Sequence, residues 1–231
     1  GIGGLVTALR LHQNGIDVKV FESVQEIKPL GVGINLLPHA VRVLTNLGLH
    51  EKMHKMAVET KDLVYANRFG QLFWEEPRGK YAGYKWPQYS VHRGLFQMLL
   101  WNHAIEVLGK DRLFTNFHFD SFDQNEQEVT AHFIDKESGS IVHSETADFL
   151  IGADGIHSRV RKILYPNEGA VVFSGNILYR GTTLMKPFSS GATMAMIGSL
   201  RQKMVIYPID TTLDENGYQL INWVANLKDT N

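Results

Sequence analysis

The sequence of 231 residues predicts an α/β domain joined to a second domain made mainly of antiparallel strands. Two observations lead to this prediction. Near the start, a glycine-rich turn opens a helical pattern, and a short strand that ends in an acidic residue follows it. From about residue 170 onward the helical patterns stop and only strand-like segments remain. We therefore expect residues 1–170 to form the first domain, with 62–88 packing on the second, and 171–231 to form an incomplete second domain.

The bulk composition is that of an ordinary globular protein, and it excludes several kinds of site. Hydrophobic residues make up 44% of the sequence and charged residues 20%. Lys and Arg total 23 against 24 Asp and Glu, so no basic excess indicates a nucleic-acid or membrane-surface partner. The sequence has no cysteine, which excludes disulfides, thiolate metal sites and cysteine nucleophiles. It also lacks a run of about 18 apolar residues and a recognisable targeting segment, so we expect a cytoplasmic protein without a membrane span.

The first element is a helix that begins in the glycine-rich turn, followed by a strand at residues 17–22. A dinucleotide pyrophosphate needs bare backbone amides at a helix N-terminus, where side chains would block its approach. Gly1 and Gly4 fit the second and third glycines of G-x-G-x-x-G, and Glu22 stands where a carboxylate would accept the ribose hydroxyls. A plain β-α-β unit without a ligand is the alternative. The predicted dinucleotide contacts are Gly1, Gly3, Gly4, Leu5 and Glu22.

The middle of the chain predicts further helices and strands in a regular order. Helices are expected over residues 38–47 and 93–108, and three strands form a meander between residues 113 and 147. The apolar run from Phe149 to Gly152 predicts a short strand, buried on both faces if it joins a parallel sheet. Strands of the second domain are expected at 176–183, 192–197, 203–209 and 219–225.

The segment from Gly152 to Arg161 contains the most specific motif. Its sequence, Gly-Ala-Asp-Gly-Ile-His-Ser-Arg-Val-Arg, places an acidic turn between the apolar run and a helix. It resembles the G-A-D-G-x-x-S-x-x-R signature of FAD-dependent aromatic-ring hydroxylases and matches every defined position. The resemblance implies that Asp154 and Gly155 support the cofactor and that Arg161 organises the turn or the nicotinamide route. A surface helix start without a ligand is the alternative.

Two other stretches are similar to the same family. Residues 30–40 resemble its glycine loop, where small residues let the flavin approach the main chain, and this implies cofactor contacts at Gly31, Val32 and Gly33. In residues 89–99, Arg93 matches the family's FAD-contacting arginine. Residues 29–35, 76–79 and 87–90 look most like hydroxylases of the phenazine and salicylate type.

The resemblance implies a Rossmann-like, para-hydroxybenzoate-hydroxylase-like FAD domain with an antiparallel substrate domain. It also implies that NADH or NADPH reduces FAD and that O₂ supplies an oxygen atom to a small aromatic substrate. Because the cofactor performs the chemistry, we assign no catalytic acid or base. Wall candidates for the substrate pocket are Tyr179, Met194, Met196 and Tyr207, and ordinary sheet core is an equal alternative for each.

The sequence also departs from the family pattern. The family's later Gly-Asp segment and C-terminal helix are not found, so we expect a chain truncated at both ends. His50-Glu51-Lys52-Met53-His54 satisfies H-E-x-x-H, but no third ligand follows at a recognisable spacing, and we assign no metal. Two other functions stay open: a flavin-dependent reductase or epoxidase acting on a non-aromatic substrate, and a non-catalytic nucleotide-binding module.

Overall fold

The computed structural model describes residues 1–228, which divide into two compact units. The first unit combines residues 1–28 with 97–171, and the second combines 29–96 with the chain from residue 172 onward. Helix α4 (Arg93–Leu108) starts in the second unit and continues into the first. The predicted division of the whole protein into domains at residue 170 stays a prediction.

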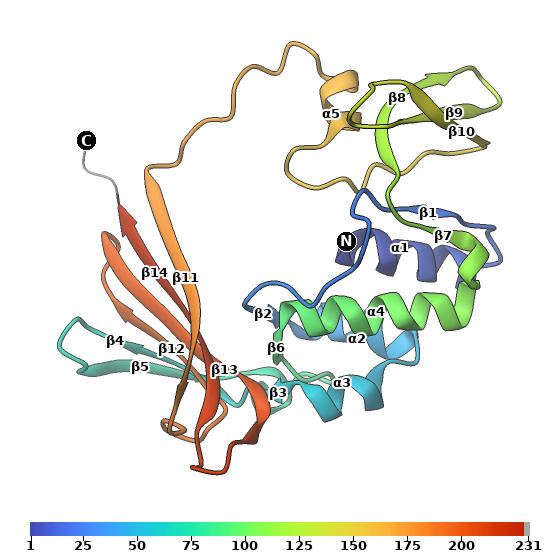
Figure 1. Cartoon of the computed structure of the whole chain (residues 1–231). Coiled ribbons are helices and arrows are strands. Elements are labelled where there is room, and N and C mark those ends of the chain that lie inside the picture. Colours follow the sequence, from blue (N-terminus) through green and yellow to red (C-terminus); the bar gives the residue numbers. More distant parts are fainter. Residues whose placement is uncertain (229–231) are drawn as a thin grey trace. The chain divides into compact units, whose positions relative to one another are not determined.

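The first unit contains a parallel strand pair and an antiparallel meander. Strands β1 (Val20–Phe21) and β7 (Leu113–Phe114) pair in parallel, and helix α1 (Ile2–Gln13) precedes β1. The meander runs in the order β10-β9-β8, and its strands lie side by side in Figure 1. The remaining elements of this unit are η2 (Lys110–Arg112), β8 (His118–Gln124), β9 (Val129–Ile134), β10 (Ile141–Ala147) and α5 (Arg159–Leu164).

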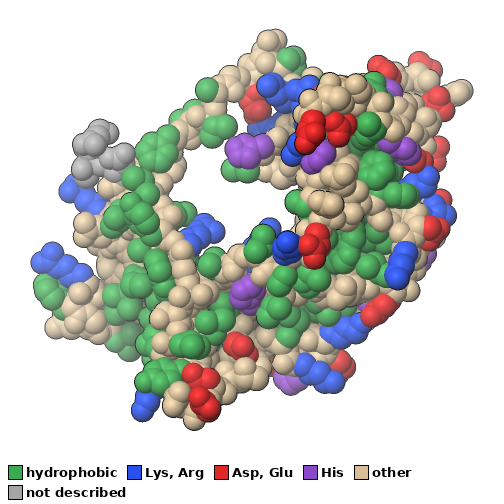
Figure 2. All heavy atoms as spheres, viewed as in Figure 1, with side chains coloured by type: hydrophobic (Ala, Val, Ile, Leu, Met, Phe, Trp, Pro, Cys, Tyr) green, Lys and Arg blue, Asp and Glu red, His purple; other side chains and the backbone are tan. Residues whose placement is uncertain are grey.

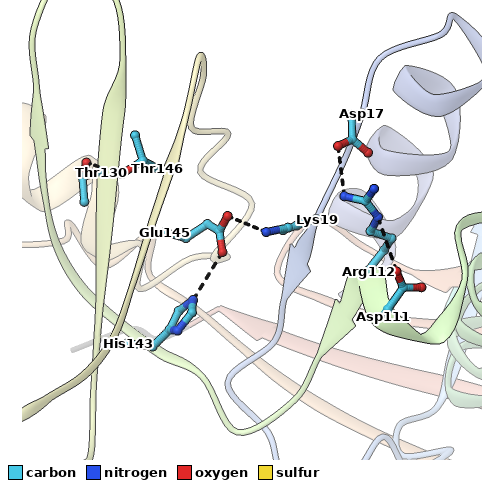
Figure 3. Close-up of polar contacts among 8 residues, drawn as sticks. All are labelled: Asp17, Lys19, Asp111, Arg112, Thr130, His143, Glu145 and Thr146. Atoms are coloured by element: carbon cyan, nitrogen blue, oxygen red, sulfur yellow. Dashed lines mark hydrogen bonds and ion pairs between the residues drawn. The ribbon is translucent and has the colours of Figure 1, made fainter.

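Aromatic rings and one ion pair join the parallel pair to the meander. The ring of Phe21 stacks on Phe114 of β7 at 4.9 Å and on Phe133 of β9 at 4.5 Å. Figure 3 shows Lys19, which precedes β1, reaching Glu145 of β10, with Nζ 2.6 Å from Oε1. The pKa of Glu145 lies below its ordinary value, chiefly because Lys19 donates this hydrogen bond. The meander is therefore fixed against β1, the strand that directly precedes Glu22.

The prediction of a short strand over Phe149–Gly152 is wrong. The structure has no strand there, and the side chains of Phe149 and Ile151 are 87% and 53% exposed. The reason is that a strand can be buried on both faces only inside a larger sheet. In the described part of the chain, the parallel sheet of this unit consists of β1 and β7 alone.

The second unit contains two sheets and two helices. A three-stranded antiparallel sheet has the order β2-β6-β3, and a six-stranded sheet has the order β11-β14-β13-β12-β4-β5. The elements before helix α4 are β2 (Gly33–Leu36), α2 (Pro38–Asn46), α3 (His50–Met56), β3 (Val58–Glu59), β4 (Asp62–Ala66), β5 (Leu72–Pro77), η1 (Gly79–Ala82) and β6 (Tyr89–His92). The later strands are β11 (Asn176–Met185), β12 (Thr193–Gly198), β13 (Gln202–Leu213) and β14 (Gln219–Lys228).

Strand β4 joins the six-stranded sheet although it precedes the other central strands by a long stretch of chain. It pairs in parallel with β12 and antiparallel with β5, whereas the other pairs of this sheet are antiparallel. Hydrophobic side chains remain visible over this sheet in Figure 2, and the exposed ones include Phe73, Trp74, Leu178 and Leu184. No helix among residues 1–228 is long and apolar enough to cross a membrane.

Candidate functional site

The N-terminus of helix α1 presents bare backbone. The first helical hydrogen bond runs from the Leu5 amide to the Gly1 carbonyl at 3.1 Å, and the amides of Ile2, Gly3 and Gly4 have no partner in the described part of the chain. A Cβ atom added at Gly1 or Gly3 would meet no atom within 4 Å. Unpaired amides and the positive end of the helix dipole favour an anion at such a position.

Glu22 lies beside this helix start, as the spacing predicts. Its Oε2 lies 2.8 Å from the backbone nitrogen of Gly1, and its Oε1 accepts the amides of Ser23 at 2.8 Å and Val24 at 3.3 Å. Burial raises the pKa of the Glu22 carboxyl, and the hydrogen bonds from the Ser23 and Val24 amides lower it. A hydrogen-bond acceptor therefore stands next to the glycine turn.

The acidic turn at Asp154 is held by its own backbone. Oδ1 of Asp154 accepts the Ser158 hydroxyl at 2.6 Å, and Oδ2 accepts the amides of Arg159 at 2.6 Å and Val160 at 3.1 Å. Burial raises the pKa of Asp154, but these hydrogen bonds outweigh it and the pKa lies below its ordinary value. Ser158 in turn caps helix α5 by accepting the Arg161 amide at 3.0 Å. The helix starts at Arg159, directly after this double cap.

The two motifs of the first unit meet at one point. A Cβ atom at Gly4 would lie 3.3 Å from the Cβ of Ala153, so the turn before Asp154 packs against the first turn of helix α1. Gly155 has φ +81 and open space at its Cα. The structure therefore brings Gly4, Ala153 and Gly155 into one local region of exposed backbone.

The arginines after the turn make protein contacts. The guanidinium of Arg161 forms an ion pair with Glu168. Arg159, which the sequence reasoning missed, donates to the Asp120 carbonyl at 2.9 Å and to its carboxylate at 3.2 Å. Arg159 thus attaches the turn to strand β8. The sequence signal for this role was an arginine directly after the serine that caps the helix. The cofactor role of Arg161 stays a prediction.

In the second unit, the glycine loop and Arg93 lie together. Gly31 has φ +117, and side-chain atoms of Arg93 lie 3.8 Å from the position of an added Cβ. The Arg93 amide donates to the Val32 carbonyl at 2.8 Å. Loop and helix start are therefore one structural feature, and the Arg93 guanidinium forms no hydrogen bond or ion pair with a described residue.

Gly33 packs directly against the six-stranded sheet and is hydrogen-bonded to Asn222, a residue that the sequence reasoning missed. Asn222 of β14, which is 0% exposed, accepts the Gly33 amide on Oδ1 at 2.7 Å. A Cβ atom at Gly33 would lie 2.6 Å from Tyr207, 2.7 Å from Ile209 and 2.8 Å from Asn222. Only glycine fits this approach. The signal for Asn222 was a lone amide inside the otherwise apolar run Leu-Ile-Asn-Trp-Val.

The wall candidates of the substrate pocket do not share one face of the sheet. Cross-strand partners lie on the same face, and Tyr207 pairs with Asn222, which puts Tyr207 on the face that contacts Gly33. Met196 pairs with Val205, two residues before Tyr207, so Met196 and Met194 share that face.

Tyr179 lies on the opposite face. It pairs with Ala225, Ala225 pairs with Met204, and Met204 pairs with Ile197, the neighbour of Met196. Its side chain is 55% exposed, whereas Tyr207 is 5% exposed. A single wall can therefore include Met194, Met196 and Tyr207 without Tyr179.

The H-E-x-x-H segment forms helix α3, with the rings of His50 and His54 6.4 Å apart. Among residues 1–228, no group of three or more His, Cys, Asp or Glu side chains is placed to hold a metal ion.

Comparison with known proteins gives a consistent set of relatives. A family model described as an FAD binding domain matches residues 1–230. The phenazine 1,6-dicarboxylic acid hydroxylase PhzS of Lysobacter antibioticus is 39% identical over 231 residues, which is 99% of this chain and 57% of that protein. A 3-hydroxybenzoate 6-hydroxylase of Polaromonas naphthalenivorans (strain CJ2) is 34% identical over 191 residues, 81% of this chain and 46% of that protein. The chain spans about half the length of the curated relatives it matches.

Solved structures confirm the fold class. HpxO of Klebsiella pneumoniae, in complex with FAD and uric acid, superposes with a TM-score of 0.78 at 21% identity and covers 99% of this chain and 55% of that chain. The 2,6-dihydroxypyridine-3-hydroxylase of Arthrobacter nicotinovorans superposes with a TM-score of 0.70 at 23% identity, covering 99% of this chain and 54% of that chain.

Proposed function

The chain belongs to the FAD-binding domain family, and we propose that the full-length protein is an FAD-dependent monooxygenase that hydroxylates an aromatic acid. The single observation on which this rests is the contact between the first turn of α1 and the Gly-Ala-Asp-Gly turn, where Gly4 faces Ala153. Two separate motifs with bare backbone meet there, as a dinucleotide pyrophosphate requires.

The residues present fit FAD. Gly3 and Gly4 would hold the pyrophosphate with the unpaired amides of the helix start, Gly1 and Leu5 would flank it, and Glu22 would accept the ribose hydroxyls. In the loop of residues 31–33, Gly31 offers exposed main chain next to the guanidinium of Arg93, which has no partner among residues 1–228. Asp154 would keep the turn at Gly155 in shape through its capping hydrogen bonds.

The overall reaction balances as one hydroxylation. An aromatic C–H, O₂, NAD(P)H and one proton give an aromatic C–OH, NAD(P)⁺ and water. FAD supplies the redox chemistry when bound, and the protein binds, orients and excludes water. Because NAD(P)H is consumed, a cytoplasmic location suits this proposal.

The substrate class follows from the relatives and from one face of the sheet. The relatives named above are hydroxylases of a phenazine dicarboxylic acid and of a hydroxybenzoate. Met194, Met196 and Tyr207 share the sheet face that also contacts Gly33, so an apolar wall with one phenol would stand beside the glycine loop. A flat aromatic ring is suited to such a wall.

The test is an absorbance spectrum of the purified full-length protein, followed by flavin reduction with NADPH in the presence of single aromatic acids or phenazines. We expect bound flavin whose reduction is accelerated by one of these aromatics. Bound flavin that is reduced equally fast with every aromatic acid would favour a reductase or epoxidase. A full-length protein that takes up no FAD would contradict the proposal and leave a nucleotide-binding module.

A further inference from the structure

A cavity of about 300 Å³ lies at the far end of strand β2 from Gly33. It is bounded by the start of helix α2, the end of β5 and the segment that leads into β6. Leu37 lines it directly after β2, so about 13 Å of extended strand separates it from Gly33, at roughly 3.3 Å per residue. The residues that carry the argument are Pro38, His39, Arg42, Arg78, Trp86 and Gln88.

Arg78 is a fixed cation in this cavity. Its amide donates to the Lys61 carbonyl at 2.8 Å, its Nε donates to Oε1 of Gln88 at 2.9 Å, and its Nη1 donates to Glu76 at 2.7 Å. Gln88 is 1% exposed, so the guanidinium is bound to a buried amide. Its Nη2 has no partner in the described part of the chain and remains a donor for a ligand.

The backbone below Arg78 is fixed as well. Gly79 has φ +53, a region that favours glycine, and a Cβ atom there would collide with the amide nitrogen of Gln88. The turn after Arg78 therefore packs main chain against main chain. The position of the cation is set before any ligand arrives, which lowers the entropic cost of binding.

Arg42 is the second cation, and no acidic residue neutralises it. It is exposed and forms no hydrogen bond or ion pair with any residue among 1–228, and its guanidinium carbon lies 5.7 Å from the centre of the Trp86 ring. The Nζ of Lys85 lies 5.3 Å from the same ring. The guanidiniums of Arg42 and Arg78 line the cavity, whereas no Asp or Glu is among its lining residues.

The helix start adds to this positive charge. Helix α2 begins at Pro38, its N-cap Leu37 provides no side-chain cap, and the first-turn amide of His39 has no partner in the described part of the chain. Pro38 and Trp86 meanwhile supply flat apolar walls. The cavity therefore combines two guanidiniums and a helix N-terminus with an aromatic surface.

We propose that this cavity binds an aromatic carboxylate. The carboxylate would accept hydrogen bonds from Arg42 and Arg78, and the ring would lie against Trp86 and Pro38. The apolar walls of Trp86 and Pro38 would be covered by the ring of an aromatic carboxylate, whereas inorganic phosphate has no apolar part to bury there. This site is separate from the proposed hydroxylation site and does not depend on it.

The test is titration calorimetry of the FAD-loaded full-length protein with benzoate. Arg42→Gln removes a cation that makes no hydrogen bond in the protein, so the fold should be unaffected. We expect benzoate to bind about tenfold more weakly to this variant. Arg201→Gln makes the same chemical change at an exposed arginine outside the cavity, and we expect it to leave benzoate binding unchanged.

Two further probes separate the possible outcomes. Benzyl alcohol keeps the ring without the charge, and inorganic phosphate keeps the charge without the ring; both should bind more weakly than benzoate. Equal binding of phosphate and benzoate, or equal benzoate binding to wild type and Arg42→Gln, would overturn the proposal. Benzoate that shifts the flavin absorbance and still binds Arg42→Gln occupies the proposed hydroxylation site instead. Absence of benzoate binding in a protein whose flavin reduction responds to an aromatic acid would overturn this inference alone.

Discussion

The glycine loop of residues 31–33 and the turn at Asp154 are both expected to contact FAD, yet they are held in shape by opposite means. The turn depends on hydrogen bonds from residues 158–160, which are its immediate neighbours in sequence. The loop depends on close packing against Tyr207, Ile209 and Asn222, which lie far along the chain. A change in the loop should therefore disturb distant structure, whereas a change in the turn should remain local.

The largest effect is expected for Gly33→Ala. The added methyl would lie between 2.6 and 2.8 Å from three side chains of the sheet, and relieving such overlap should cost about 3 kcal/mol of unfolding free energy. Urea unfolding of the FAD-free full-length protein measures this. Gly3→Ala is the control, because its methyl group would meet no atom within 4 Å. Since residue 3 lies in a helix, where alanine is favoured over glycine, this variant should raise the free energy of unfolding by up to about 1 kcal/mol. A Gly33→Ala protein as stable as wild type would show that the loop is not seated on the sheet.

A smaller loss is expected for Asn222→Ala. The variant leaves the Gly33 amide without its acceptor and opens a cavity at a fully buried position. Together these changes should lower the free energy of unfolding by about 2 kcal/mol. We also expect the protein to retain less FAD, measured by gel filtration and absorbance, because the loop is no longer held against the sheet. Asn226→Ala changes the same residue type on the same strand without removing a described hydrogen bond. If both variants lose the same amount of stability, the hydrogen bond between Asn222 and Gly33 does not account for the loss.

Gly155→Ala tests the turn at Asp154 and should lower the free energy of unfolding by less than Asn222→Ala does. Gly155 has φ +81 but open space around its Cα. The added methyl group therefore causes backbone strain alone, which should lower the free energy of unfolding by about 1 kcal/mol. Thermal unfolding would detect it. A loss larger than that of Gly33→Ala would reverse the comparison between the two regions.

Asp154→Asn should have the smallest effect at neutral pH, about 0.5 kcal/mol, since one acceptor oxygen remains and the site is exposed to solvent screening. The pKa of Asp154 is lower in the folded state than in the unfolded chain. The contribution of the Asp154 carboxylate to folding stability is therefore complete above the pKa of an unfolded aspartate, near 4. It is lost as the pH falls through the lower pKa of the folded state. Stability measured from pH 7 down to pH 3 should show less acid sensitivity in Asp154→Asn than in wild type. Asp148→Asn, an exposed carboxylate without a described hydrogen bond, should behave like wild type.

The same contrast explains what the sequence could predict. The resemblance to FAD-dependent hydroxylases and the α/β fold with a later antiparallel sheet are confirmed, because their motifs and strand patterns are local. The strand at Phe149–Gly152 was predicted wrongly, since a strand needs a neighbouring strand to pair with, and an apolar run does not reveal one. Asn222 was missed because its partner, Gly33, is distant in sequence. The cofactor roles of individual residues stay predictions, as does the division into domains.

The parallel pairing of β4 with β12 also has a consequence for how the protein is made. The β4–β5 hairpin leaves the ribosome early, but its partner strand begins only at residue 193. Until then one edge of β4 has no strand beside it, and Leu63 and Ala66 of β4, which are buried in the finished structure, lack the neighbouring sheet. Unpaired strand edges with apolar side chains are prone to wrong association during synthesis. The nascent chain should thus depend most on chaperones while residues between the hairpin and β12 are being added, and a slow stretch of translation there would lengthen that exposure.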